Sequence, residues 1–472
     1  MDVIDSRALA ARHFGGARLG DARRARRLVS AAEHILRHPQ GGLPQQVGGG
    51  WAQTMGLYRL LAAPAVTHAA VLAPHRQAVL ERLRKHDGVV LLVHDATELN
   101  YSHVAALADQ LGHVGSGRGT ARGLVAHHTL AVTPDGAVLG LVNQALHRRD
   151  RVDPRETKAQ KRARPSRESR LWLAGCEAAG PAPAGKMWVD VADRGADAFE
   201  FVNYLRARGR HFVIRSAKDR KLDGDDHVGA DRVHDHLHQY ARDLPELGRR
   251  TLDVSAQAGG KRKARRATVA VSAGPATLGP NRWTRGEHDG GPVDLWVVRV
   301  AEVDPPPGVR PLEWILLTDL DARSFAGACV AVDYYARRPV VEELHKGMKT
   351  GLGVERLRLE HVDRLEPAIA LLSVIAALLL ELRDAARRPD ADATPATSLV
   401  PALWVRVLSG RIEGRPRADL SVREFLRGVA RLGGHLGRKR DGPPGWLTLW
   451  RGWQDLQLMV AGAEAVARGA SG

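Results

Sequence analysis

The chain has 472 residues, of which 70 are lysine or arginine and 53 are aspartate or glutamate, giving a formal net charge of +17. Such an excess of positive charge favours a polyanionic partner, because each phosphate that a protein neutralises releases condensed counterions. The only cysteines, Cys176 and Cys329, stand far apart in the sequence. This excludes a disulfide framework and a Cys-x-x-Cys metal site.

The hydrophobic segments predict no contact with a membrane. Residues 1–15 lack an apolar stretch flanked by charge, so no signal peptide is expected. The most apolar run, Ala368–Leu380, is shorter than the roughly 20 residues that a membrane-spanning helix needs. We expect a soluble, cytoplasmic protein.

The first 70 or so residues are predicted to form a helical, basic domain. In the stretch Leu19–Leu36, Asp21 stands where a helix N-cap is expected, and apolar residues recur behind it. Three arginines share one face of this helix, which predicts contact with phosphates or bases: Arg23, Arg24 and Arg27.

Strand patterns begin near residue 88. Continuous or alternating apolar runs occupy residues 88–95, 129–142, 186–197, 211–216 and 312–319. The second of these contains Pro134-Asp135-Gly136, which predicts a hairpin. Helical segments lie between several of the runs, so the fold class is α/β with a mixed sheet.

The chain divides into three predicted domains. Residues 71–365 form the α/β domain, which contains a β-rich insertion at about 220–310. Residues 366–472 are mostly helical and include a long apolar helix from about 368 to 386.

Two aspartates follow apolar runs and are candidates for catalysis. Asp95 and Asp193 each stand where a hydrophobic run gives way to polar residues, the usual place for functional carboxylates in α/β folds. Acids also end strands simply as turn formers. Together with Glu342 on a later helix they supply three carboxylates, enough to hold two Mg²⁺ ions for in-line phosphoryl displacement.

Three segments resemble the catalytic motifs of bacterial DDE transposases. They are "HDATELNY" (His94–Tyr101), "DRGAD" (Asp193–Asp197), and the set Tyr335, Arg338, Glu342 and Lys349. The last set is similar to the YREK signature of the insertion-sequence-four family, which includes the transposon-five transposase. The resemblance implies a ribonuclease-H-like core interrupted by the β-rich insertion.

Further segments resemble the same family in the same order along the chain. "LGDARRARRLV" is similar to its end-recognition segment, and residues 430–457 are similar to its dimerisation region. "FVIRS" carries Arg215, which the resemblance places on DNA near the active site. "LEWILLT" carries Trp314, which the resemblance makes the acceptor of a base flipped from the DNA end; a flat apolar ring suits that role.

The resemblance implies a cut-and-paste DNA transposase. Asp95, Asp193 and Glu342 would bind Mg²⁺, with Mn²⁺ as a substitute. The remaining signature residues, Tyr335, Arg338 and Lys349, would hold the terminal phosphates. The partners are double-stranded DNA, as transposon ends and as target, and a second copy of the chain in a homodimer. On DNA the protein would be nucleoid-associated.

Two positions depart from the family pattern. Gly195 stands where a glutamate usually follows the Asp-Arg of the second motif, and Asp197 is the nearest acid after it. Pro339 replaces the tryptophan that usually follows the signature arginine. Proline is tolerated in the first turn of a helix, so we predict that a helix starts or kinks at Pro339, with Glu342 in its first turn.

Two other functions remain open at this point. A catalytically inactive, DNA-binding relative acting as a regulator or inhibitor would keep the basic helix without a working metal site. A ribonuclease-H-like nuclease without transposition would need neither Trp314 nor the basic helix.

Overall fold

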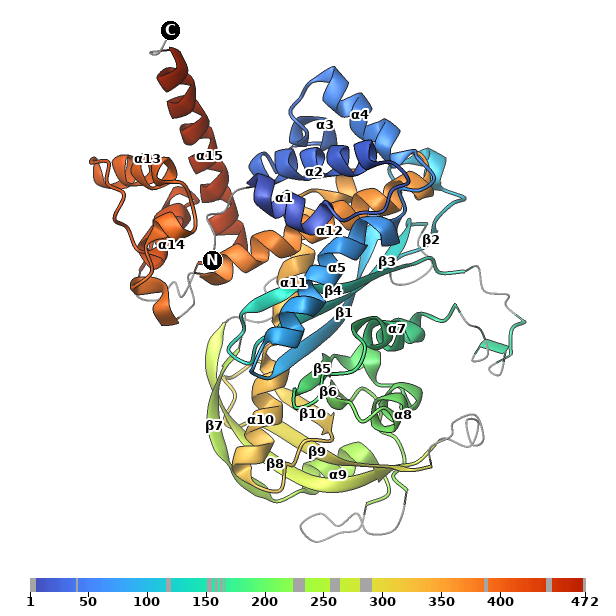
Figure 1. Ribbon diagram of the computed structural model, residues 1–472. Helices are drawn as coiled ribbons and strands as arrows, with labels where there is room; N and C mark the ends of the chain where they lie inside the picture. Colours follow the sequence, from blue (N-terminus) through green and yellow to red (C-terminus); the bar gives the residue numbers. More distant parts are fainter. Residues whose placement is uncertain are drawn as a thin grey trace.

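A computed structural model describes residues 6–39, 41–115, 120–150, 155–157, 160–161, 164, 166–223, 234–254, 264–280, 291–385, 389–438 and 444–469. A mixed sheet forms its centre, with helices packed on both faces (Figure 1). The predicted α/β class with a mixed sheet is therefore confirmed. In the part of the chain that the structure describes, no helix is long and apolar enough to cross a membrane.

The sheet contains ten strands among the described residues, in the order β2-β3-β1-β5-β6-β10-β9-β8-β7, with β4 beside β3. Their bounds are β1 Val90–Asn100, β2 Gly112–His113, β3 Arg122–Val132, β4 Val138–His147, β5 Trp188–Ala192, β6 His211–Arg215, β7 Glu246–Val254, β8 Arg265–Leu278, β9 Val293–Glu302 and β10 Glu313–Thr318. The predicted hairpin is the β3–β4 pair. Strands β7 to β9, from the region predicted to be β-rich, continue the same sheet.

The strand directions decide which residues meet at one edge. Strand β1 is antiparallel to β3 but parallel to β5, and β5 is parallel to β6. The register pairs His94 with Ala192, so the next residues along these strands, Asp95 and Asp193, come side by side. Strands β5 and β6 therefore end at the same edge of the sheet.

The helices of the N-terminal half are α1 Ser6–Phe14, α2 Ala22–Arg37, α3 Leu43–Gln46, α4 Trp51–Leu61, α5 His68–Lys85, α7 Leu171–Ala179, α8 Phe199–Ala207 and α9 Leu237–Asp243. Those of the C-terminal half are α10 Phe325–Ala336, α11 Pro339–Lys346, α12 Val362–Ala385, α13 Ala402–Glu413, α14 Val422–Leu432 and α15 Trp446–Gly469. Helix α2 begins as predicted, because the Asp21 side chain accepts a hydrogen bond from the Arg23 backbone N–H at 2.7 Å.

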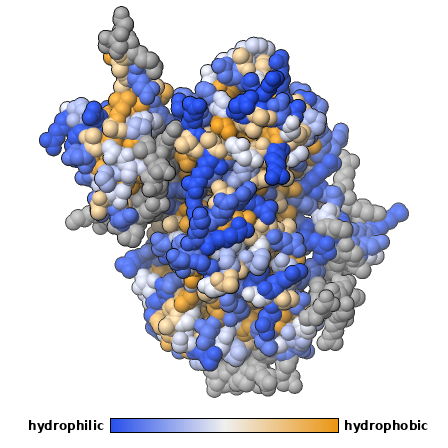
Figure 2. Space-filling view, in the orientation of Figure 1, coloured by the Kyte–Doolittle hydropathy of each residue, from blue (hydrophilic) through white to orange (hydrophobic). Residues whose placement is uncertain are grey.

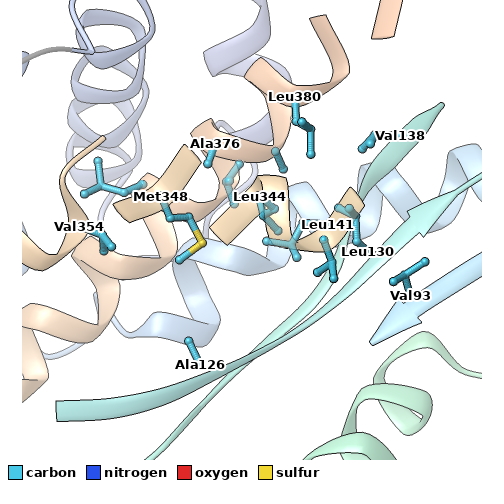
Figure 3. Close-up of a cluster of buried hydrophobic side chains, with 14 of the residues drawn as sticks. Val93, Ala126, Leu130, Val138, Leu141, Leu344, Met348, Val354, Ala376 and Leu380 are labelled. Atoms are coloured by element: carbon cyan, nitrogen blue, oxygen red, sulfur yellow. The ribbon is translucent and has the colours of Figure 1, made fainter. Parts of the chain in front are cut away.

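The apolar helix α12 is the centre of the hydrophobic core. Every residue from Ala368 to Leu380 is buried, as expected of a helix that is hydrophobic all round. Figure 3 shows Ala376 and Leu380 facing Leu344 and Leu141, so α12 and α11 share one layer against the sheet. The helix starts at Val362, earlier than predicted, and Pro367 lies inside it, five residues after its start.

The terminal helices lie on the side of the core that carries α12. In Figure 1 the first helices (blue) pack on α12 (orange), and α13 to α15 form a separate group at one side. This group has its own hydrophobic cluster, in which Phe425 and Trp453 are buried. The Gln457 side chain of α15 donates a hydrogen bond to the Leu36 carbonyl at 3.2 Å and so connects the group to α2.

Candidate active site

The two aspartates predicted to be catalytic lie side by side, but they do not both end strands. Strand β1 continues past Asp95 to Asn100, so Asp95 lies in its interior, whereas Asp193 follows the last residue of β5. The sequence suggested a strand end at Asp95 because polar residues begin there. The strand continues because residues 91–100 all pair with β3.

Arg338 connects all three predicted carboxylates. Its Nη2 lies 2.7 Å from Oδ2 of Asp95 and 3.7 Å from Oδ2 of Asp193, while Nη1 lies 2.7 Å from Oε1 of Glu342. The structure thus brings the three acids around one guanidinium. Arg338 was predicted to hold phosphate; its i,i+4 spacing from Glu342 allows the ion pair seen here, whereas its contacts with Asp95 and Asp193 had no signal in the sequence.

Burial governs the electrostatics of this cluster. Burial raises the pKa of Asp95 to about 6; the charge of Arg338, the next-largest effect, opposes this rise, and the negative charges of Asp193 and Glu342 add smaller increases. Burial tends to lower the pKa of Arg338, but the surrounding carboxylates raise it above its ordinary value. The site therefore holds more negative charge than one arginine relieves, which suits a hard cation with oxygen ligands.

Pro339 lies at the first position of α11, and Glu342 lies in its first turn, as predicted. The chain turns between α10 and α11 at Arg337 and Arg338. At the first position of a helix the missing N–H of proline costs no hydrogen bond. Pro339 therefore begins the helix whose first turn carries Glu342. Glu342 and Asp95 are both ion-paired with Arg338.

Tyr335, Trp314 and Arg215 form a wall next to the carboxylates. The Trp314 and Tyr335 rings meet edge to face, with centroids 4.9 Å apart. Arg215 Nη2 donates to the Glu313 carbonyl at 2.8 Å, and the Arg215 side chain also forms a hydrogen bond with Tyr335. Burial, together with the Coulomb repulsion of Arg194 and Arg338, lowers the pKa of Arg215.

Lys349 makes its contacts with residues other than the three carboxylates. Helix α11 passes into a short π-helix, Gly347–Gly351, which contains Lys349. Its Nζ donates to the Glu98 carbonyl and lies 3.7 Å from Oε1 of Glu355. The ammonium group is therefore held beside the later part of β1.

The structure explains why position 195 is a glycine. A Cβ there would lie 2.7 Å from Cζ2 of Trp172 and 3.1 Å from Oδ1 of Asp193. Trp172, on α7, fills the space that a side chain at 195 would need. Asp197 does not substitute for the family glutamate, because its buried carboxylate binds Arg220 and the backbone N–H groups of Ala217 and Lys218.

A buried polar network supports the strands from the opposite face. His94 Nε2 lies 2.8 Å from Oδ1 of Asp190, and Arg210 Nε donates to Oδ2 of Asp190 at 2.7 Å. Cys176 Sγ lies 3.3 Å from the same carboxylate, and one ligand atom from each of His94, Cys176 and Asp190 falls within 4.8 Å of the others. Since Arg210 already neutralises Asp190, we assign this network to anchoring β1 and β5.

Sequence reasoning missed this network, although a signal was present. Asp190 is a single acid in the otherwise apolar strand β5 and is fully buried. A buried carboxylate requires a partner. Its partners, His94 and Arg210, could have been sought from that rule alone.

The three arginines of α2 lie outside the carboxylate site. Arg23 and Arg27 are exposed, and Arg24 is partly buried with its Nη1 donating to the Leu19 carbonyl at 2.9 Å. Arg27 reaches across Gly56 of α4, where an added Cβ would lie 1.9 Å from its Nη1. These residues belong to the N-terminal helical group rather than to the site around Arg338.

Both ends of the chain match models of known protein families. Residues 6–66 match a transposase DNA-binding domain, and residues 397–471 match the dimerisation domain of transposase Tn5. The matches indicate a transposase and support both binding to DNA and formation of a homodimer. The carboxylate cluster lies between the two matched segments and outside both of them.

Proposed function

We propose that the protein is a cut-and-paste DNA transposase of the insertion-sequence-four family and that Asp95, Asp193 and Glu342 are its catalytic triad. The single observation that carries this proposal is the convergence of the three acids on Arg338. The two matched domains supply the context of DNA and a second subunit.

The sheet supports a ribonuclease-H-like core. The order β4-β3-β1-β5-β6, with β3 antiparallel to β1 on one side and β5 and β6 parallel to it on the other, is the arrangement expected of that fold. Strands β7 to β9 are inserted between β6 and β10 and extend the sheet. We assign residues 71–365 to this domain, with the DNA-end-binding domain before it and the dimerisation domain after it.

The donor set fits a pair of hard divalent cations such as Mg²⁺. All three side chains offer carboxylate oxygens, and burial together with like charge makes Asp95 costly to ionise. Bound there, Mg²⁺ would activate the attacking oxygen and stabilise the leaving oxygen of a phosphodiester. Asp95, Asp193 and Glu342 would hold the metal.

The remaining residues bind and orient the DNA. Arg338, once released from the acids, presents a planar guanidinium that matches a phosphate, and Tyr335 adds a hydroxyl. Trp314 offers an aromatic face beside Tyr335 for a base drawn out of the duplex. Lys349, beside the later part of β1, would contact a phosphate farther along the strand.

The reaction would proceed in steps at one site. Hydrolysis nicks one strand at the element end, and the freed 3′-hydroxyl attacks the opposite strand to give a hairpin. Hairpin opening and strand transfer into target DNA follow. Because a dimer brings two ends together, each triad can act on DNA held by the other subunit.

The test uses the full-length protein with DNA that flanks its own coding region. We expect strand cleavage in Mg²⁺ that is abolished by chelation and by Asp193→Asn, with unchanged DNA binding. Binding without any metal-dependent cleavage would instead support an inactive DNA-binding relative. Cleavage of DNA lacking the element ends, at an equal rate, would support a simple nuclease.

A further inference from the structure

An arginine-rich hollow of about 810 Å³ opens beside the carboxylate cluster. Five arginines line it, with Trp314 at the wall: Arg194, Arg215, Arg265, Arg299 and Arg310. Arg194 directly follows the triad residue Asp193, so the hollow and the cluster adjoin.

Four of the five arginines of the hollow fall into two kinds, and the fifth, Arg215, donates to the Glu313 carbonyl. Arg265 and Arg299 are ion-paired, with Glu302 at 2.6 Å and Glu313 at 3.1 Å. Arg194 and Arg310 are exposed, and for neither does the described part of the chain provide a hydrogen-bonding or ion-pairing side chain. Two carboxylates thus face five guanidinium groups, and the hollow carries a net positive charge.

The shape and chemistry of the hollow select the ligand. Its volume is within the range of about 300–1,000 Å³ of small-ligand sites, so it suits a few nucleotides of one strand rather than the full width of a duplex. A cationic groove next to a stacking aromatic ring is how proteins bind single-stranded DNA without reading its sequence. Trp314 and the arginines provide these two elements together.

We propose that this hollow binds the sugar-phosphate backbone of an unpaired DNA strand that leaves the triad, with Arg194 and Arg310 as its phosphate contacts. The inference rests on the proposed function, because it takes the bound polymer to be the DNA cleaved at Asp95, Asp193 and Glu342. It assigns a DNA contact to Arg310, which lies outside the sequence motifs, and a specific role to Arg194, the arginine of the second motif.

Fluorescence anisotropy without divalent metal tests the proposal on the full-length protein. The probes are a labelled blunt duplex and the same duplex with a short single-stranded tail at either the 5′ or the 3′ end. We expect one of the tailed duplexes to bind at least about tenfold more tightly than the blunt one. The double variant Arg194→Gln/Arg310→Gln should lose that gain while binding the blunt duplex normally.

The dependence on salt gives a second measurement. For the tailed duplex, the slope of log affinity against log salt should fall by about 0.7 for each arginine removed, as for phosphates of a single strand. Arg206→Gln/Arg411→Gln removes the same charge from exposed positions outside the hollow and should leave the preference for the tail intact. Thermal unfolding checks that both double variants are folded.

Three outcomes would overturn the inference: equal affinity for blunt and tailed duplexes, equal weakening of both by Arg194→Gln/Arg310→Gln, or the same loss of tail preference in the control variant. Failure of the proposed function can be distinguished from failure of this inference. A protein that prefers the tail through Arg194 and Arg310 but never cleaves in Mg²⁺ would contradict the transposase reaction and leave the strand-binding site standing.

Discussion

Arg338 is the residue on which the site depends. In the structure its guanidinium lies among Asp95, Asp193 and Glu342 and partly neutralises them. A divalent cation would need the same oxygens. Under the proposed function, Arg338 and the metal would compete for these oxygens, and Arg338 would be freed to bind a DNA phosphate once the metal is held.

Replacing Arg338 with glutamine should tighten metal binding in the absence of DNA. A unit charge about 4 Å away at an effective dielectric constant of about 20 is worth about 4 kcal/mol, so we expect affinity for Mn²⁺ to rise at least tenfold. Isothermal titration calorimetry measures this. Arg250→Gln, which breaks the ion pair with Asp333, is the control and should change nothing. Weaker or equal Mn²⁺ binding by the Arg338 variant would contradict the competition.

Restoring the family glutamate at position 195 should destabilise the protein. Trp172 fills the space, and overpacking costs typically about 1–3 kcal/mol. We expect Gly195→Glu to lower the free energy of unfolding in urea by about that amount. In a Trp172→Ala background the same substitution should cost clearly less. Equal costs in both backgrounds would show that Trp172 is not the obstacle.

At the scale of the elements, the hydrophobic pattern predicted much of the fold. The capped helix α2, the β3–β4 hairpin and the start of α11 at Pro339 each follow from local signals: an N-cap, a turn sequence and a proline. The extension of β1 past Asp95 could not be predicted from local signals. The residues there are more polar, and it is the pairing with β3 that continues the strand.

The candidate site was predictable in part for the same reason. The motifs supplied Asp95, Asp193 and Glu342, and the parallel register of β1 and β5 explains why two of them meet. The i,i+4 spacing of Arg338 and Glu342 is visible in the sequence, but the contacts of Arg338 with Asp95 and Asp193 and the π-helix at Lys349 depend on packing and helix geometry that no spacing reveals. The presence of glycine at position 195 is explained only by the position of the Trp172 side chain in the structure.

The contact between β3 and α11 should make the protein sensitive to acid. His128 Nδ1 and His345 Nε2 lie 3.1 Å apart, and burial lowers the pKa of His128 to about 3 and that of His345 well below its ordinary value. The unfolded chain then binds protons that the folded chain excludes. The stability from these neutral histidines is complete above about pH 6.5 and is lost as pH falls toward about 3.

His128→Gln removes one of these groups and should flatten the dependence of stability on pH. Each unit of separation between the folded and unfolded pKa is worth about 1.4 kcal/mol. Between pH 7 and pH 4.5 we therefore expect the variant to lose about 2–3 kcal/mol less unfolding free energy than the wild type, measured with urea at several pH values. His211→Gln, at a partly exposed ring, is the control. Parallel curves for wild type and the His128 variant would refute the assignment.

For the whole molecule, the exposed apolar residues of α15 are candidates for the contact between two copies, because they lie in the matched dimerisation segment. Leu458 and Val466 are 70% and 74% exposed on a helix within the matched dimerisation segment. Figure 2 shows a surface otherwise dominated by hydrophilic residues, between which hydrophobic residues are scattered.

Leu458→Asp/Val466→Asp should therefore weaken the complex of two subunits with two DNA ends. Analytical ultracentrifugation with DNA should show one subunit per end for the variant and two bridged ends for the wild type. Glu464→Lys, also exposed on α15, is a control for altered surface charge. A variant that still bridges two ends would place the interface elsewhere.

The central claim is that Asp95, Asp193 and Glu342 form one catalytic metal site, and Glu342→Ala tests it most directly. The measurement is the rate of Mg²⁺-dependent cleavage of end-bearing DNA, with DNA binding measured in parallel and Glu360→Ala, an exposed acid, as the control. We predict a loss of at least about a hundredfold in rate with unchanged binding. Cleavage at the wild-type rate by the Glu342 variant would contradict the account.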